Sequence, residues 1–170
     1  QYIYNSDSSL VQYLIRKGRT RRNKKYTGHS PRVVKKESII KKSIHERSLE
    51  GTNRLTIGHS ESDFIVSCRG GRSVLLVEAD RKIRKIHLRL LPNREAETAR
   101  VAMFGIAELA KLHGGLRSLT VDNDTAHNNL HYLEPVFKDS DLKVLFCEPY
   151  KAWQRGTIEA INGILRRWFP

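Results

Sequence analysis

Cysteine is scarce in this chain, which has two such residues, Cys68 and Cys147, among 170. They form no CxxC pair, so the sequence indicates neither a cysteine-based zinc site nor a disulfide framework. We expect both thiols to be reduced and buried. Long apolar runs are also absent, because none approaches the roughly 18 residues that a membrane-spanning helix needs. We therefore expect no membrane partner.

Acidic residues are few relative to basic ones, with 18 Asp+Glu against 31 Lys+Arg, a net charge of +13 and a pI of about 10.0. A protein this basic needs a polyanionic partner, and nucleic acid is the usual one. The excess is uneven: residues 1–57 hold 14 Lys+Arg and 4 Asp+Glu, whereas residues 58–170 hold 17 and 14. This division predicts a basic arm at 1–57 attached to a nearly balanced globular domain at 58–170.

The predicted arm has two parts. Residues 8–17, SSLVQYLIRK, have the pattern of a short amphipathic helix that begins after a serine cap. Residues 18–36 carry many cations and few apolar side chains, so we expect this stretch to be extended or disordered. Its cations suit phosphate binding, although a solubilising tail is the alternative. The proposed DNA-binding residues of the arm are Arg19, Arg21, Arg22, Lys24 and Lys25.

The globular part reads as an α/β domain. Alternation and apolar runs predict strands at 62–68, 73–80, 86–91, 118–122 and 143–147, with a hairpin turn at 69–72. Helical spacing predicts helices at 95–113 and at 157–168. Three antiparallel strands followed by strands that alternate with helices imply a mixed five-stranded sheet flanked by helices.

Three acids occupy costly positions in this pattern. Asp63 lies within the first strand, Asp122 ends the fourth strand, and Glu159 lies in the first turn of the last helix. Around that helix, the aliphatic residues share one face, which we expect to pack on the sheet. Asn162 and Arg166 share the opposite face with Glu159.

Converging carboxylates repel one another, and divalent cations remove that repulsion. Oxygen-only ligands select Mg²⁺ or Mn²⁺ over zinc. Two such ions, about 3.5–4 Å apart, activate a water or a 3′-hydroxyl for attack on a phosphodiester. We therefore expect two ions held by Asp63, Asp122 and Glu159, with Arg155 and Arg166 neutralising DNA phosphate.

Four stretches resemble insertion-sequence-30-type transposases: GHSESDFIV, SLTVDND, the lead-in SIHERSLE and, most specifically, the closing FCEPYKAWQRGTIEAINGILRRWFP. The resemblance implies a ribonuclease-H-like fold of the retroviral integrase superfamily and a DDE triad of Asp63, Asp122 and Glu159. It also implies DNA cleavage and joining during transposition. Asn162, which helical spacing places beside Glu159, is expected to bind DNA. The expected setting is a homo-oligomer on transposon ends and target DNA in the bacterial cytoplasm, associated with the nucleoid. We further expect the chain to be a fragment, truncated at its C-terminus, around the catalytic core.

The chain departs from the family pattern at Ser60, where the family has Trp, and at Asp124, where it has Gly. These departures favour an alternative: a degenerate relic that binds DNA without cutting it. A ribonuclease or resolvase of the same fold is a third hypothesis, which explains the closing motif poorly.

Several neighbouring side chains have both a functional and a structural interpretation. Asp124 is either a substitute ligand or a turn cap, and Asn123 shapes the loop after Asp122. His127 and His131 have the spacing of a zinc pair but lack a third ligand. For His59 we favour a structural hydrogen bond over contact with a metal site.

Overall fold

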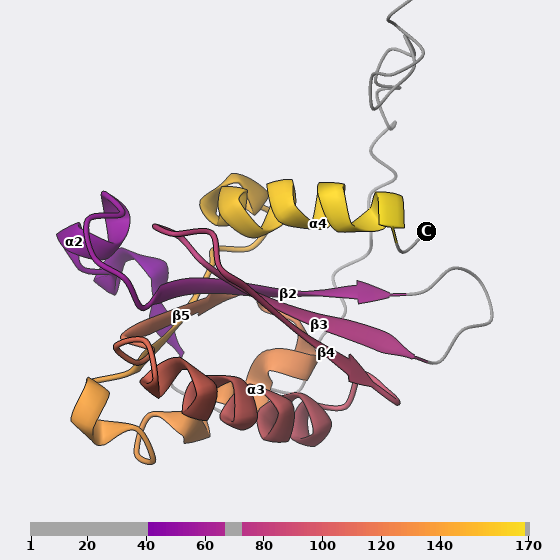
Figure 1. The fold of residues 1–170 in the computed structure, drawn as a ribbon, viewed down its shortest axis with the longest axis horizontal. Helices are drawn as coiled ribbons and strands as arrows, with labels where there is room; N and C mark the ends of the chain where they lie inside the picture. Colours follow the sequence, from indigo (N-terminus) through magenta and orange to yellow (C-terminus); the bar gives the residue numbers. More distant parts are fainter. Residues whose placement is uncertain (1–40, 67–72, 169–170) are drawn as a thin grey trace, which may run out of the picture. The chain divides into compact units, whose positions relative to one another are not determined.

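The computed structural model describes residues 41–66 and 73–168 (Figure 1). Strands β2 (His59–Val66), β3 (Val74–Asp80) and β4 (Ile86–Leu91) form an antiparallel meander. Strands β5 (Ser118–Val121) and β6 (Lys143–Phe146) follow in parallel on the other side of β2. The sheet is therefore mixed, as predicted, and its order is β1-β6-β5-β2-β3-β4.

The sheet has six strands among the described residues, so the predicted number of five is wrong. The additional strand is β1 (Lys42–Ser43), which pairs in parallel with the edge of β6. The 3-10 helix η2 (Ile44–Glu46) and helix α2 (Leu49–Thr52) come next. All three lie in the range that we assigned to the basic arm. A two-residue edge strand needs only backbone pairing, with Ile44 buried beside it, and so leaves no hydrophobic pattern to detect.

Helices cover both faces of the sheet. Figure 1 shows the sheet lying between helices α3 and α4. Helix α3 (Ala96–Lys111) packs with the 3-10 helix η3 (Thr125–Leu133) over the larger apolar cluster. Helix α4 (Gly156–Trp168) contacts β2 and β3 on the other face, over a smaller cluster. The short 3-10 helices η4 (Lys138–Ser140) and η5 (Ala152–Arg155) complete the described elements.

The alternation of β2 assigns its side chains to the two faces. Phe64 belongs to the cluster under α3, and Ile65 belongs to the cluster under α4. Asp63 therefore shares the α4 face with Ile65, as the period of two predicts. Strand β2 begins after Gly58, whose φ is +96° and where a Cβ would lie 2.5 Å from the carbonyl oxygen of Gly115. Both facts restrict this position to glycine.

The other predicted elements agree with the structure within two residues, whereas β2 begins three residues earlier than predicted. The predicted helix at 8–17, the turn at 69–72 and Cys68 lie outside the described residues. Cys147 is buried with a free thiol, as predicted, and burial raises its pKa to about 11. In the described ranges, no helix has the length and apolar content to cross a membrane.

Candidate active site

Asp63 and Asp122 lie level with each other on neighbouring parallel strands. The register of β2 and β5 pairs Glu61 with Thr120, and continuing it by two residues brings Asp63 opposite Asp122. Side chains level with each other on adjacent strands point to the same face. The fold therefore places these two carboxylates side by side on the α4 face, although 58 residues separate them in the chain.

Arg155 lies between the two carboxylates. Its Nη1 is 3.4 Å from Asp63 Oδ1, and its Nη2 is 3.5 Å from Asp122 Oδ2. Nη1 also donates a hydrogen bond of 3.2 Å to the carbonyl oxygen of Ser62. The side chain is buried, which by itself would lower the pKa of Arg155, but Asp63 and Asp122 outweigh burial and raise it. The arginine assigned to DNA phosphate is thus an internal counter-ion in this structure.

Other donors hold the remaining carboxylate oxygens. Asn162 Nδ2 donates to Asp63 Oδ2 at 3.0 Å. His127 Nδ1 donates to Asp122 Oδ1 at 2.5 Å, and the backbone N–H of Asp124 donates to the same oxygen at 3.1 Å. Asp63 Oδ1 also accepts the neighbouring N–H of Phe64. Each aspartate is therefore oriented so that its other oxygen faces Arg155.

The surroundings of Asp122 favour its ionised form. Burial acts to raise the pKa of Asp122, but the hydrogen bond and charge of His127, the charge of Arg155 and the N–H of Asp124 together lower it to about 2. The His127 ring is fully buried and stacks on Phe64 at a centroid distance of 4.7 Å. Because this packing fixes the imidazole, it also fixes the carboxylate that the imidazole contacts.

Helix α4 is attached to the sheet by a buried acid that our sequence analysis missed. Glu61 Oε2 accepts the backbone N–H of Ile158, at the first turn of α4, at 2.9 Å. Its Oε1 lies 2.9 Å from Nε of the buried Arg81. The carboxylate thus compensates an unpaired N–H at the helix N-terminus and a buried cation together. Glu61 lies two residues before Asp63 in β2 and therefore on the same face of the strand. The pattern that identified Asp63 thus applies to Glu61 as well.

Glu159 lies in the first turn of α4 and is exposed. A negative charge is stabilised there by the helix dipole. Asn162, one turn further along, reaches Asp63, so Glu159 projects from the helix turn next to the aspartates. In residues 41–66 and 73–168, no three His, Cys, Asp or Glu side chains are grouped to hold a metal ion. The aspartate oxygens suit Mg²⁺ or Mn²⁺ by donor type, but Arg155 fills the place they share.

The buried face of α4 is rotated somewhat from the predicted one. Ile158, Ile161 and Asn162 are buried, whereas Ile164 and Trp168, predicted to pack on the sheet, are 52% and 76% exposed. Asn162 was predicted on the outer face and is instead the donor to Asp63. The helical period alone cannot make this distinction, because it does not reveal a polar partner on the sheet.

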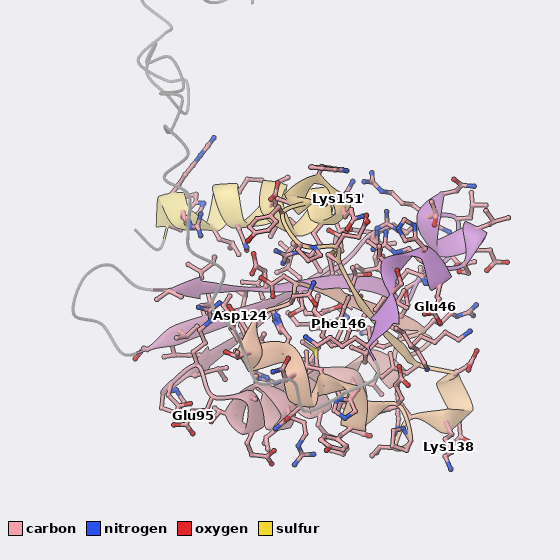
Figure 2. The ribbon with its side chains drawn as sticks, turned by 180° about the vertical axis from the view of Figure 1, so that it is seen from behind. Glu46, Glu95, Asp124, Lys138, Phe146 and Lys151 are labelled. Atoms are coloured by element: carbon pink, nitrogen blue, oxygen red, sulfur yellow. The ribbon has the colours of Figure 1, made fainter. Side chains whose placement is uncertain are left out.

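The loop after Asp122 has structural roles for its polar residues. Asp124 caps η3 through the N–H of Ala126 and forms an ion pair with Arg94, as expected for a turn cap. Asn123 Nδ2 donates to the carbonyl of Cys147, which joins this loop to the end of β6. Figure 2 shows Asp124 from the opposite side of the molecule.

The histidines do not form the zinc pair. His131 Nδ1 donates to the carbonyl of Asn128 at 2.6 Å, while His127 contacts Asp122. His59 is buried and bonds Ser118 Oγ through Nδ1 at 2.8 Å, in agreement with its predicted structural role.

The structure describes only some of the predicted DNA-binding cations. Arg166 is exposed in the last turn of α4. The cations of the arm, Arg19, Arg21, Arg22, Lys24 and Lys25, lie outside the described residues.

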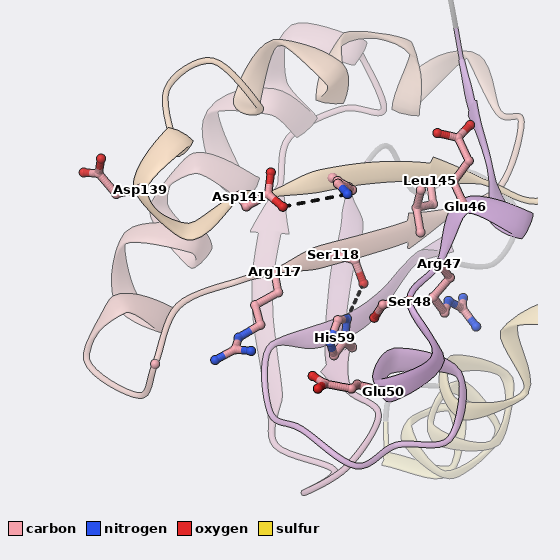
Figure 3. A pocket seen from close by; sticks show the side chains of 12 residues that line it. Glu46, Arg47, Ser48, Glu50, His59, Arg117, Ser118, Asp139, Asp141 and Leu145 are labelled. Atoms are coloured by element: carbon pink, nitrogen blue, oxygen red, sulfur yellow. Dashed lines mark hydrogen bonds and ion pairs between the residues drawn. The ribbon is translucent and has the colours of Figure 1, made fainter.

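Two hollows lie at opposite ends of β5. One, of about 320 Å³, is lined by Asp122, Arg155, Tyr150 and their neighbours. The other, of about 450 Å³, lies around Ser118 and His59 (Figure 3). Its wall mixes acids and bases, such as the ion pair of Lys143 with Asp141 at 3.7 Å. The aspartate end of the strand is the candidate site, because Asp63 and Asp122 converge there on Arg155.

The meander, the two parallel strands and the helices on both faces define a ribonuclease-H-like domain. The chain is 32% identical over 156 residues to the transposase for insertion sequence element IS1086 from Cupriavidus metallidurans. The aligned region covers 92% of this chain and 44% of that relative. It is also 32% identical over 162 residues to the transposase InsI for insertion sequence element IS30C from Escherichia coli K12. This aligned region covers 94% of this chain and 40% of that relative. The chain belongs to the insertion-sequence-30-type transposase family, and it spans less than half the length of these relatives.

A solved structure, the catalytic core domain of BIV integrase, is similar at a TM-score of 0.45 and 14% identity. The match covers 59% of this chain and 61% of that chain. No family model matches the chain.

Proposed function

We propose that this chain is the catalytic core of a DNA transposase, which cuts and joins DNA strands during transposition in the bacterial cytoplasm. The observation that carries the proposal is the convergence of Asp63 and Asp122 on Arg155, beside the helix that bears Glu159. Family membership adds support, because the relatives are named as transposases.

Asp63, Asp122 and Glu159 are the proposed ligands of two Mg²⁺ or Mn²⁺ ions. When bound, such ions activate a water or a 3′-hydroxyl and stabilise the leaving oxygen of a phosphodiester. Asn162 and His127 keep the two aspartates oriented by holding one oxygen of each. Glu61 keeps the first turn of α4, and with it Glu159, beside β2.

DNA binding falls to exposed cations in this proposal. Arg166 contacts the backbone near the site, and the arm, with Arg19, Arg21, Arg22, Lys24 and Lys25, adds contacts that do not depend on sequence. We expect at least two copies to assemble on paired DNA ends.

Nicking of supercoiled plasmid in Mn²⁺ or Mg²⁺ tests the proposal. We expect the wild-type chain to nick the plasmid and both Asp122→Asn and Glu159→Gln to lose nicking while remaining folded. The matched control is Glu108→Gln on the exposed side of α3, which should nick like wild type. Equal nicking by all four proteins would contradict the proposed ligands.

The relic that binds DNA without cutting is the second candidate. It is favoured by the ion pairs of Arg155 with both aspartates and by the lack of a three-acid group among the described residues. A folded chain of this kind binds DNA with an affinity that falls steeply with salt. It shows no nicking at any concentration of divalent ion, which separates it from the enzyme.

A further inference from the structure

Arg155 contacts one oxygen of each aspartate: Asp122 Oδ2, and Asp63 Oδ1, which also accepts the N–H of Phe64. Asn162 holds Asp63 Oδ2, and His127 holds Asp122 Oδ1. The other two oxygens each face one terminal nitrogen of the guanidinium, at 3.4 and 3.5 Å. The cation therefore lies where one oxygen of each aspartate converges.

The position of Arg155 is built into the fold. The residue is 8% exposed, ends η5 directly before α4, and donates to the carbonyl of Ser62 on the strand that carries Asp63. Two ionised carboxylates level on adjacent strands repel each other, and a buried cation between them removes that cost. A planar guanidinium contacts both at once, which a single ammonium group does less well.

We propose that Arg155 is an internal counter-cation that occupies the shared place of Asp63 and Asp122 and competes with a divalent ion for it. This inference rests on the proposed function, since it concerns the same aspartates. Ion binding then requires the guanidinium to leave, and its two nitrogens become available to a DNA phosphate. In this structure the guanidinium offsets one of the two negative charges of Asp63 and Asp122.

Calorimetric titration of Mn²⁺ into the chain tests this competition without measuring activity. We expect Arg155→Gln to bind Mn²⁺ about tenfold more tightly than wild type, because a competing cation lowers affinity by its coupling to the ion. The affinity of Arg155→Lys for Mn²⁺ should lie between those of Arg155→Gln and wild type. Lysine keeps the positive charge but lacks the two terminal nitrogens of the guanidinium. Without metal, Arg155→Gln should unfold at lower temperature than wild type, and Mn²⁺ should raise its midpoint by more.

Lys41→Gln is the matched control, because Lys41 also acts on Asp122 by its charge but donates its hydrogen bond to Asn123. Its affinity for Mn²⁺ should rise much less than that of Arg155→Gln. Equal gains in these two variants would reduce the effect to net charge and overturn the inference. Should Arg155→Gln fail to fold, Arg155→Lys decides by the same comparison with wild type.

Failure of the inference differs from failure of the proposed function. Unchanged or weaker Mn²⁺ binding by Arg155→Gln, with binding still lost in Asp122→Asn, overturns the competition and leaves the metal site. Absence of Asp122-dependent binding in both wild type and Arg155→Gln overturns both.

Discussion

The two faces of the sheet differ in the size of the apolar cluster that each one buries. Under α3, the larger apolar cluster fills the core, as at Met103, Ile106 and Leu119, and His127 and Glu78 are buried beside it. Under α4, a small apolar cluster adjoins buried polar and charged groups, including Glu61 and Arg81. The first face stabilises the fold by removing apolar surface from water. The second uses part of that stability to hold charges in fixed places.

Buried charges are tolerated on the α4 face because each has a partner. Removing both members of such a pair is often harmless, whereas removing one leaves an uncompensated charge. The charged face should therefore be the more sensitive of the two to single substitutions, residue for residue. Three substitutions test this contrast, beginning with the largest expected effect.

Glu61→Ala should have the largest effect, because it leaves the Arg81 cation and the Ile158 N–H buried without their partner. We expect a loss of about 3–5 kcal/mol in the free energy of unfolding. Urea denaturation measures it. Glu108→Ala, which removes an exposed acid paired with Lys111, should cost about 0.5 kcal/mol or less. A similar small loss for Glu61→Ala would refute the proposed role of the buried pair.

Leu119→Ala breaks the apolar face. Leu119 is fully buried in β5 within the larger cluster, so its truncation should cost about 2–4 kcal/mol through lost burial and a residual cavity. The same substitution at Leu112, which is 78% exposed, should change stability by about 0.5 kcal/mol or less. If Leu119→Ala proves costlier than Glu61→Ala, the order of the two faces is reversed.

The smallest effect concerns Asp122 and pH. Its pKa of about 2 lies below the ordinary 3.8, so its contribution is fully present above about pH 4 and is lost as pH falls through 2. His127→Gln loses the stacking on Phe64 at every pH. It also removes one cause of the pKa shift, so it should cost about 1 kcal/mol more at pH 5 than near pH 2. His131→Gln is the control, since His131 donates to a backbone carbonyl and should show no such pH dependence. Denaturation at several pH values gives both curves, and parallel curves for the two variants would contradict the assignment.

Local sequence predicted most of the sheet, because apolar alternation and glycine turns act over a few residues. Strands β3 to β6 and helices α3 and α4 were located in this way. Strand β1 was missed because Lys42 and Ser43 carry no apolar signal and pair only through their backbones with β6.

The site was predicted in outline. Asp63 and Asp122 were chosen as acids at costly strand positions, and the structure brings them together. The sequence did not indicate that Arg155 would lie between them, since an arginine before a helix has the same local pattern whether it faces DNA or the interior. Glu159 stays a prediction as a ligand, because it is exposed and belongs to no three-acid group of the described residues.

The order of apolar and polar residues by itself determined the mixed α/β sheet, the two packed helices and the choice of Asp63 and Asp122 as acids at costly strand positions, because these depend on periodicity and on the cost of burial. Tertiary structure alone decided the partners of those acids. The register across β2 and β5 brought Asp63 level with Asp122. The packing of α4 on the sheet brought Asn162 to Asp63 and the N–H of Ile158 to Glu61. Such contacts join residues that are distant in the chain, so no local pattern encodes them.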